Sequence, residues 1–290
     1  VERVGRHDNF FELGGHSLMA VNLVARMRHV GLAADVRVLF SQPTLAALAA
    51  AVGDETETEV PANRIAPDCK HITPDMLPLV ALDQPAIDRI VASIPGGAAN
   101  VQDIYPLAPL QAGILFHHLS APQGDPYVLQ AQFAFADESR LRVFAEALQA
   151  VIERHDILRT SLFWDGLQEP VQVVWRQASL VCETVELDAA EVDALSQLRN
   201  RFDARQYRMA VTQAPLMRVV HGWDAVNRRV VALLLFHHLV MDHIALEVLR
   251  HEMQAVLLGQ VRQLAEPVPY RNYVARTRSG LSEEEHETFF

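Results

Sequence analysis

The stretch from Val230 to His243 reads VVALLLFHHLVMDH, and it decides the fold class of this chain. It opens with an unbroken apolar run, residues 230–236, which suits a strand that is covered on both faces. Apolar residues spaced as on one face of a helix then follow, namely Leu246, Leu249, Met253 and Val256. The same helical spacing occurs within residues 140–152, and residues 171–175 form another strand-like run. This alternation predicts an α/β lobe in which helices flank a buried central sheet.

The bulk composition excludes several classes of protein. The 290 residues leave room for one small and one larger domain, at about 150 residues per domain. The 36 acidic residues outnumber the 25 Lys and Arg, so no nucleic-acid or anionic-membrane partner is expected. Cys69 and Cys182 are far apart in the sequence, which predicts neither a disulfide framework nor a cysteine zinc site. Because the apolar runs are shorter than the ~20 residues of a membrane helix and no signal peptide opens the sequence, we expect a cytoplasmic protein.

The sequence divides into a small unit, a linker and a larger unit. Residues 1–52 contain two segments with apolar residues at helical spacing. Residues 53–69 are acidic, contain two prolines and have few apolar side chains, which predicts a solvated segment. A short helix is expected over residues 84–94, where Pro95, Gly96 and Gly97 stop it. We therefore place an interdomain linker with one short helix over residues 53–100 and the larger unit over residues 101–290.

The first chemical site is Ser17, in the stretch Gly14-Gly15-His16-Ser17-Leu18. The two glycines allow a tight turn, and the serine falls where the first amphipathic helix begins. Unpaired backbone N–H groups and the helix dipole favour a phosphate at such a position. Serine is also a common N-cap residue of helices, so its position alone does not distinguish a phosphate attachment site from a plain N-cap. A nucleophile elbow, Gly-x-Ser-x-Gly, is excluded because Met19 occupies the place of the last glycine.

The wider stretch from Asp8 to Leu18, DNFFELGGHSL, resembles the attachment motif of peptidyl carrier domains in nonribosomal peptide synthetases. The resemblance implies a small α-helical carrier bundle over residues 1–52. It also implies that a phosphopantetheinyl transferase attaches a 4′-phosphopantetheine arm covalently to Ser17. The first helix of such domains is missing from the resemblance, so we expect this sequence to begin inside the domain.

The second chemical site runs from His237 to His243. Residue types alone permit core histidines, metal ligands, or a general base with an orienting carboxylate. Zinc is disfavoured, because the His-Glu-x-x-His spacing is absent and adjacent histidines on a strand point to opposite faces. We therefore expect no metal. A general base is well suited to this place, since an imidazole pKa of about 6.5 allows the ring to accept a proton near neutral pH.

The spacing His237-His238-x-x-x-Asp242 resembles the His-His-x-x-x-Asp-Gly motif of condensation domains, whose fold is like that of chloramphenicol acetyltransferase. Three further stretches resemble the same family in the same order: YPLAPLQ at 105–111, RHDILRT at 154–160 and PYRNY at 269–273. The resemblance implies that His238 is the catalytic histidine and that His237 mainly packs. It implies a structural ion pair between Asp242 and Arg159. His243 replaces the glycine of the family, and its side chain is expected to narrow the substrate tunnel.

A third stretch, from His117 to Asp125, reads HHLSAPQGD. By residue types alone, a histidine pair followed by the turn sequence Pro-Gln-Gly-Asp, residues 122–125, indicates an exposed loop after a short helix. The spacing also resembles the extra motif of dual epimerization/condensation domains, and so does the preceding stretch, residues 95–105. This resemblance implies that His117 and His118 serve the inversion of an α-carbon, and we favour it over a plain condensation domain.

Together the resemblances predict a carrier domain followed by the first lobe of a condensation domain. They imply that an aminoacyl or peptidyl thioester on Ser17 is epimerized beside His238 and is then joined to a downstream aminoacyl thioester. The implied partners are upstream adenylation domains and downstream adenylation and carrier domains of the same assembly line. A plain condensation domain and a dedicated epimerization domain are alternatives within enzymes. A non-catalytic carrier-docking module is the alternative outside them, because His243 departs from the motif.

Overall fold

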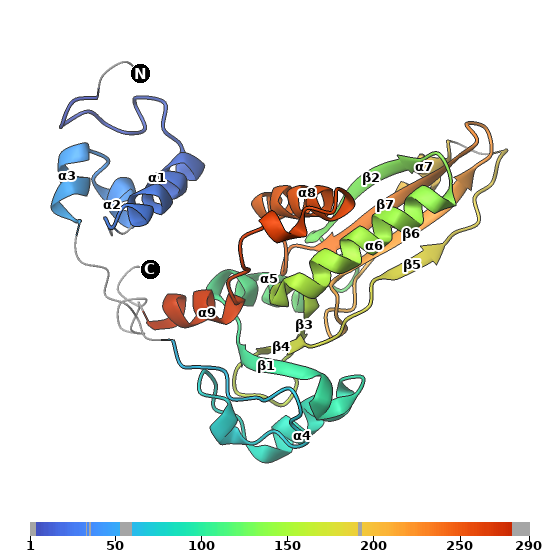
Figure 1. Cartoon of the computed structure of the whole chain (residues 1–290), viewed down its shortest axis with the longest axis horizontal. Coiled ribbons are helices and arrows are strands. Elements are labelled where there is room, and N and C mark those ends of the chain that lie inside the picture. Colours follow the sequence, from blue (N-terminus) through green and yellow to red (C-terminus); the bar gives the residue numbers. More distant parts are fainter. Residues whose placement is uncertain (1–3, 33, 35, 53–59, 191–192, 280–290) are drawn as a thin grey trace. The chain divides into compact units, whose positions relative to one another are not determined.

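The computed structural model describes residues 4–32, 34, 36–52, 60–190 and 193–279. The chain folds into two compact units, Val1–Glu59 and Val60–Phe290, which we describe one at a time. The described part of the first unit is helical, whereas the second combines helices with two sheets (Figure 1).

The first unit is a small helical bundle. Its described helices are α1 (Ser17–His29), α2 (Val36–Ser41) and α3 (Leu45–Ala50). Their apolar side chains meet in one cluster, whose buried members are Ala20, Val24, Ala34, Leu39 and Leu48. Thr44 is the N-cap of α3, because its hydroxyl oxygen accepts the N–H of Ala47 at 3.2 Å. The bundle predicted for residues 1–52 is thereby confirmed.

Residues 60–100 fold with the second unit. They contain the 3-10 helices η1 (Pro74–Met76) and η2 (Gly97–Asn100) and the helix α4 (Gln84–Ser93), which Asp83 caps. Their apolar side chains are buried against the small sheet that follows, and the set includes Ile65, Ile72, Leu77, Ile87, Ile90 and Ile94. The structure therefore corrects the linker prediction for residues 60–100. Composition predicted a solvated segment over residues 53–69 because these residues are acidic and poor in apolar side chains, yet Ile65 enters the common core. The helix predicted over residues 84–94 is α4.

A small antiparallel sheet comes next in the chain. Its strands are β1 (Val101–Pro106), β4 (Val171–Trp175) and β3 (Thr160–Phe163), in the order β1-β4-β3. The central strand β4 is buried along its whole length. It coincides with the strand predicted for residues 171–175.

The larger sheet leads to the histidine motif. It has the order β2-β7-β6-β5, with β2 (Val128–Phe135), β7 (Arg229–His237), β6 (Met217–Asp224) and β5 (Val181–Thr184). β7 is antiparallel to both of its neighbours, whereas β5 is parallel to β6. The register pairs His237 with Val128, so the end of β7 meets the start of β2.

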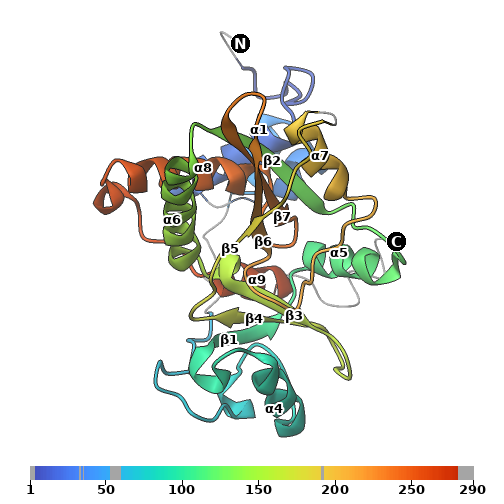
Figure 2. The ribbon, with the colours of Figure 1, turned by 90° about the vertical axis from the view of Figure 1, so that its right-hand side faces the viewer.

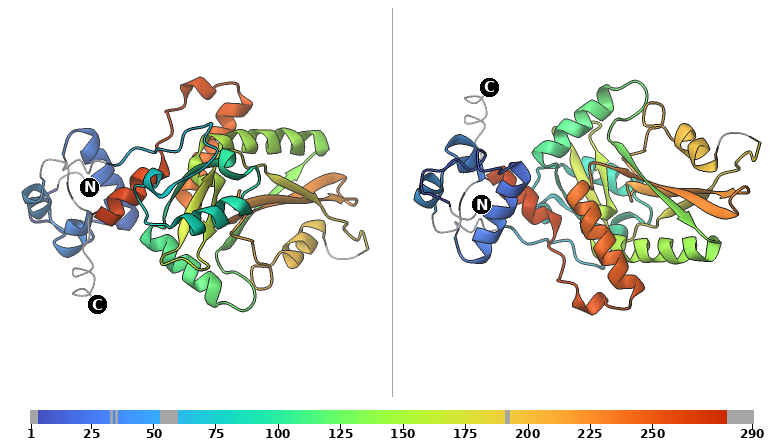
Figure 3. Two further views of the ribbon diagram at one scale, coloured as in Figure 1. Left: turned by 90° about the horizontal axis from the view of Figure 1, so that it is seen from below. Right: turned by 90° about the horizontal axis from the view of Figure 1, so that it is seen from above.

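Helices cover both faces of the larger sheet. α6 (Glu138–Arg154) and α8 (His243–Leu257) lie on one side and α7 (Ala194–Arg201) lies on the other (Figure 2, Figure 3). This double cover explains the unbroken apolar run of residues 230–236, all of them buried. α5 (Pro109–Ser120) precedes β2, η3 (Asp156–Arg159) precedes β3, and η4 (Val261–Gln263) and α9 (Tyr270–Ser279) follow α8. In the ranges that the structure describes, no helix is long and apolar enough to span a membrane.

Candidate functional site

Ser17 is the first residue of α1 and is exposed on the first unit. The turn before it depends on glycine, since Gly14 has a φ of 94° and a Cβ on Gly15 would lie 2.4 Å from the ring of Phe10. The N–H of Gly15 donates to the carbonyl oxygen of Phe10 at 2.9 Å and closes this turn. Because α1 begins at Ser17, the N-cap position falls to His16. An exposed hydroxyl at a helix N-terminus suits a phosphodiester.

His238 lies directly after β7 and is half-buried. Its backbone N–H donates to the carbonyl oxygen of Tyr127 at 2.9 Å. Its Nδ1 lies 2.9 Å from the carbonyl oxygen of Met241, and because a carbonyl only accepts, Nδ1 carries the proton. The neutral ring then has an unprotonated Nε2, which is the form that a general base requires.

His237 is fully buried and forms two directed hydrogen bonds. Its Nε2 lies 2.9 Å from Oδ2 of Asp125, and its Nδ1 accepts the N–H of Leu239 at 3.1 Å. Nδ1 is therefore unprotonated and Nε2–H donates to the carboxylate. Burial lowers the pKa of His237 below its ordinary value, and the hydrogen bond and charge of Asp125 offset this only in part. That His237 packs and supports the site stays a prediction, and the structure adds that its buried ring is neutral and held in one tautomer by polar partners.

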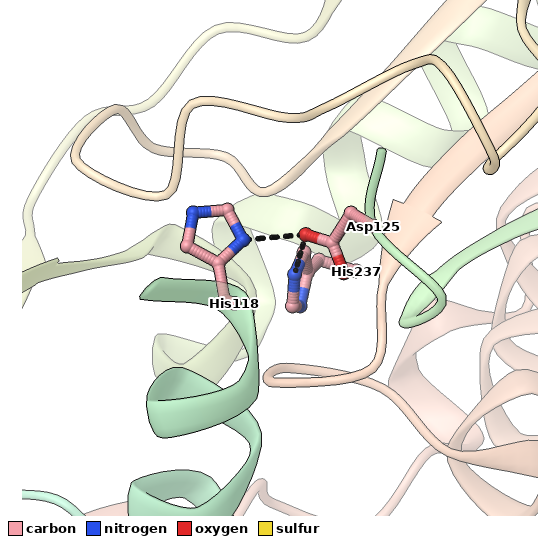
Figure 4. A group of neighbouring side chains, drawn as sticks. All are labelled: His118, Asp125 and His237. Carbon is pink, nitrogen blue, oxygen red and sulfur yellow. Dashed lines mark hydrogen bonds and ion pairs between the residues drawn. The ribbon is translucent and has the colours of Figure 1, made fainter. Parts of the chain in front are cut away.

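A second buried histidine, His118 on α5, reaches the same carboxylate (Figure 4). Its Nδ1 lies 2.5 Å from Oδ2 of Asp125. The other carboxylate oxygen, Oδ1, accepts the N–H of Tyr127 at 3.0 Å. Burial raises the pKa of Asp125, but the hydrogen bonds from His118 and His237 outweigh it and hold the pKa well below its usual range. Asp125 is therefore an ionised carboxylate inside the protein.

The buried cluster of His118, Asp125 and His237 has the residue types of a metal site, and its potential ligand atoms lie within 4.8 Å of one another. The hydrogen bonds argue against that use. Nε2 of His237 carries a proton as long as Nδ1 accepts the N–H of Leu239, and a metal ion binds only an unprotonated ring nitrogen. The cluster fits a hydrogen-bonded network better than a metal centre. That the protein needs no metal stays a prediction.

The predicted ion pair between Asp242 and Arg159 is not formed in the part of the chain that the structure describes. Asp242 is exposed and is the N-cap of α8, where its Oδ1 accepts the N–H of Ala245 at 2.7 Å. Arg159 is buried beside the small sheet and donates to Gln102 Oε1 at 3.0 Å and to the carbonyl oxygens of Ile152, Trp175 and Arg176. The expectation is corrected for a physical reason, since each charged group finds acceptors or donors within its own part of the fold.

The other two predicted residues, His117 and His243, are exposed. His117 lies on α5, and its ring centroid is 6.1 Å from that of Tyr127, which in turn is 6.5 Å from the ring of His238. The histidine pair of α5 therefore belongs to a helix beside the His238 loop. His243 is the first residue of α8 and has no positive φ, so the backbone at this position does not require a glycine.

Sequence reasoning missed Asp125, although it is the last residue of the third stretch. The available signal was the glycine before it. Gly124 has a φ of 70°, and a Cβ there would lie 2.4 Å from the carbonyl oxygen of Arg205. The N–H of Asp125 donates to the carbonyl oxygen of Ala204 at 2.7 Å. This close backbone approach, which glycine permits, fixes the carboxylate beneath the end of β7.

Comparison with known proteins yields matches for both units. The family model described as condensation domain matches residues 101–289, and the one described as phosphopantetheine attachment site matches residues 1–52. Malpinin synthetase from Mortierella alpina is 47% identical to the whole chain, which covers 4% of that protein. Tyrocidine synthase 3 from Brevibacillus parabrevis is 31% identical over 183 residues, which are 60% of this chain and 3% of that protein.

A solved structure of a four-domain nonribosomal peptide synthetase bound to AMP and glycine is similar in fold. Its TM-score is 0.53 at 20% identity, and the match covers 65% of this chain and 14% of that one. The predicted fold class is thereby confirmed. Since the condensation-domain match spans more than half of the sequence, the chain belongs to the condensation domains of nonribosomal peptide synthetases, preceded here by a phosphopantetheine attachment domain.

Proposed function

We propose that this chain carries an aminoacyl or peptidyl group on Ser17 and forms a peptide bond beside His238. One observation above all supports the proposal. The Nδ1–H of His238 donates to the carbonyl oxygen of Met241, which orients this half-buried ring and leaves Nε2 as its proton acceptor. The 4′-phosphopantetheine arm supplies the thiol that holds the acyl group as a thioester, and the hydroxyl of Ser17 would bear its phosphate.

The reaction needs a single proton acceptor. The acceptor amine attacks the thioester carbonyl, so that a C–N bond forms and the C–S bond breaks. Nε2 of His238 takes the proton that the amine loses and returns it to the leaving thiolate, or orients the amine for attack. A positioned general base contributes about 10²–10⁴-fold in rate. Holding two tethered reactants together supplies much of the remaining acceleration.

The partners follow from this reaction. A phosphopantetheinyl transferase would modify Ser17, an upstream adenylation domain would load the arm, and a downstream adenylation and carrier pair would present the amine. The chain covers only a few per cent of the synthetases to which it is similar, so these domains belong to the proposal for the whole protein.

We further propose that the same base inverts the α-carbon of the donor before condensation. The α-C–H bond lies next to the thioester carbonyl, so Nε2 of His238 could take this proton as well as the amine proton. The observation that favours this function is that His118 shares the carboxylate of Asp125 with His237. The stretch of residues 117–125 is thus built into the surroundings of His238. His117 is its exposed imidazole and is the candidate that returns a proton to the opposite face.

The condensation proposal is tested in the intact synthetase with His238→Ala. Mass spectrometry of the downstream carrier after a single turnover should show the peptide product forming about 10²–10⁴-fold more slowly than in the parent protein. His251→Ala, which removes an exposed histidine from α8, is the matched control and should retain the parent rate. Equal rates in the parent and in His238→Ala would contradict a catalytic role of His238, and the absence of peptide product from both would favour a non-catalytic docking module.

The epimerization proposal is tested with an L-aminoacyl arm on Ser17 in deuterated water. Deuterium should appear at the α-carbon together with the D-form, and His238→Ala should abolish the exchange. His117→Ala should slow the exchange more than the condensation of a preformed D-donor. Rapid condensation of the L-donor without deuterium uptake would identify a plain condensation domain.

A further inference from the structure

We infer that Asp125 is a positioning residue that orients the His238 loop from inside the protein, and that His118 acts on Asp125 rather than on the substrate. The inference rests on the proposed role of His238 in peptide-bond formation. The side chains of His118 and Asp125 are both buried, so their role is to hold the His238 loop from inside the protein and not to contact the substrate.

Two hydrogen-bonded routes lead from the carboxylate of Asp125 to the backbone of the His238 loop. In the first route, Oδ1 accepts the N–H of Tyr127, and the carbonyl oxygen of Tyr127 accepts the N–H of His238. In the second, Oδ2 accepts Nε2–H of His237, and Nδ1 of that ring accepts the N–H of Leu239. One carboxylate therefore holds two consecutive backbone N–H groups, those of residues 238 and 239. The backbone that carries the catalytic ring is thereby held at two consecutive positions, and the ring itself is oriented by the carbonyl oxygen of Met241.

His118 completes the set of donors to Asp125. Its Nδ1 is 2.5 Å from Oδ2, and its side chain is only 4% exposed. Arg208 holds the end of α5, because its guanidinium donates to the carbonyl oxygens of His118 and Ala121. A ring so enclosed does not reach a substrate that approaches His238. Its contribution is a hydrogen bond that stabilises the ionised carboxylate within the protein.

The donor and acceptor pattern makes the inference specific. His118 and His237 both donate to Asp125, so the residue at position 125 must accept at all of these contacts. An asparagine there would turn an N–H₂ group toward at least one donor. His237 does not adapt by changing tautomer without losing the N–H of Leu239. Asp125→Asn should therefore misplace His238, although the size of the side chain is almost unchanged.

The decisive experiment compares His118→Asn with His118→Ala in the intact synthetase. The amide nitrogen of asparagine occupies nearly the position of Nδ1 in histidine, so it can donate to Asp125 but cannot exchange protons as an imidazole does. If His118 positions Asp125, His118→Asn should condense at least about tenfold faster than His118→Ala. Asp125→Asn should lose about 10²-fold in the condensation rate constant, with little change in the KM for the downstream acceptor.

The control is Asp137→Asn, the same change at an exposed helix cap of α6, which should keep the parent rate. Rates are compared below the melting temperature of every variant, so a loss of folding is not counted as a loss of positioning. Equal impairment of His118→Asn and His118→Ala would overturn the inference in favour of imidazole chemistry at position 118. A parent rate in Asp125→Asn would overturn it outright. Failure of the proposed function is separate, because then the parent protein itself forms no peptide or His238→Ala is as fast as the parent.

Discussion

The ring centroids of His118 and His237 lie 5.7 Å apart in an edge-to-face arrangement, although the two residues come from separate stretches of the sequence. Asp125 accepts a hydrogen bond from each of them. The pair joins α5 to the end of β7, and the half-buried His238 is the next residue along the chain. The second and third candidate stretches of the sequence therefore meet in one hydrogen-bonded network next to His238 on the second unit, whereas Ser17 lies on the first unit.

Ser17→Ala should abolish the attachment of a phosphopantetheine arm. The exposed hydroxyl at the start of α1 is the proposed acceptor, and alanine leaves no oxygen for the phosphodiester. Intact-mass measurement after incubation with a phosphopantetheinyl transferase and coenzyme A should show one arm on the parent protein and none on the variant. Ser41→Ala, at another exposed serine of the same unit, should be modified like the parent. An arm that persists on Ser17→Ala would place the attachment site elsewhere.

Asp242→Asn should leave the stability of the protein almost unchanged, whereas Asp242→Ala should lower the free energy of unfolding by about 1 kcal/mol. The reason is that Asp242 caps α8, and asparagine caps a helix about as well as aspartate does. Urea denaturation of the two variants and the parent measures the difference. The result that contradicts this role is a loss of about 3–5 kcal/mol in Asp242→Asn, which would indicate a buried ion pair.

As the pH falls below 6.5, the parent protein should become less stable relative to His237→Gln. Burial lowers the pKa of folded His237 below its ordinary 6.5. Between the two pKa values the histidine is therefore protonated in the unfolded chain but not in the folded chain, which favours unfolding. The stability that the parent loses through His237 is zero well above pH 6.5, grows as the pH falls, and levels off below the pKa of folded His237. Its slope is at most about 1.4 kcal/mol per pH unit. Glutamine keeps an N–H donor for Asp125 near the position of Nε2 but does not titrate.

Denaturation of both proteins between pH 7.5 and about 5 tests this prediction. The difference between their two curves is the readout, because burial also raises the pKa of Asp103 to about 6, within this range. His251→Gln removes an exposed histidine and should follow the parent curve. Parallel curves for the parent and His237→Gln would show that His237 does not carry the acid sensitivity.

Local pattern was sufficient for much of the fold. The run of residues 230–236 is the buried strand β7, residues 171–175 are β4, and the helical spacing within residues 140–152 lies in α6. Such segments can be predicted because the period of their apolar residues is a property of the chain itself. The same holds for the approach to Ser17, where the glycines and the start of a helix are adjacent in the sequence.

By itself, then, the sequence determined the two units, the strand that ends at His237 and the families that the chain resembles. Only the tertiary structure decided which polar groups meet. Asp242 caps the N-terminus of α8 and does not pair with Arg159, and the apolar side chains of residues 60–100 pack in the core of the second unit. Asp125 accepts hydrogen bonds from one histidine of each pair, His118 and His237. The physical reason is that a buried polar group such as Asp125 needs hydrogen-bond partners, and the packing of distant segments decides which residues are close enough to supply them. Asp125 and His237 are 112 residues apart, and no local period of the sequence records that distance.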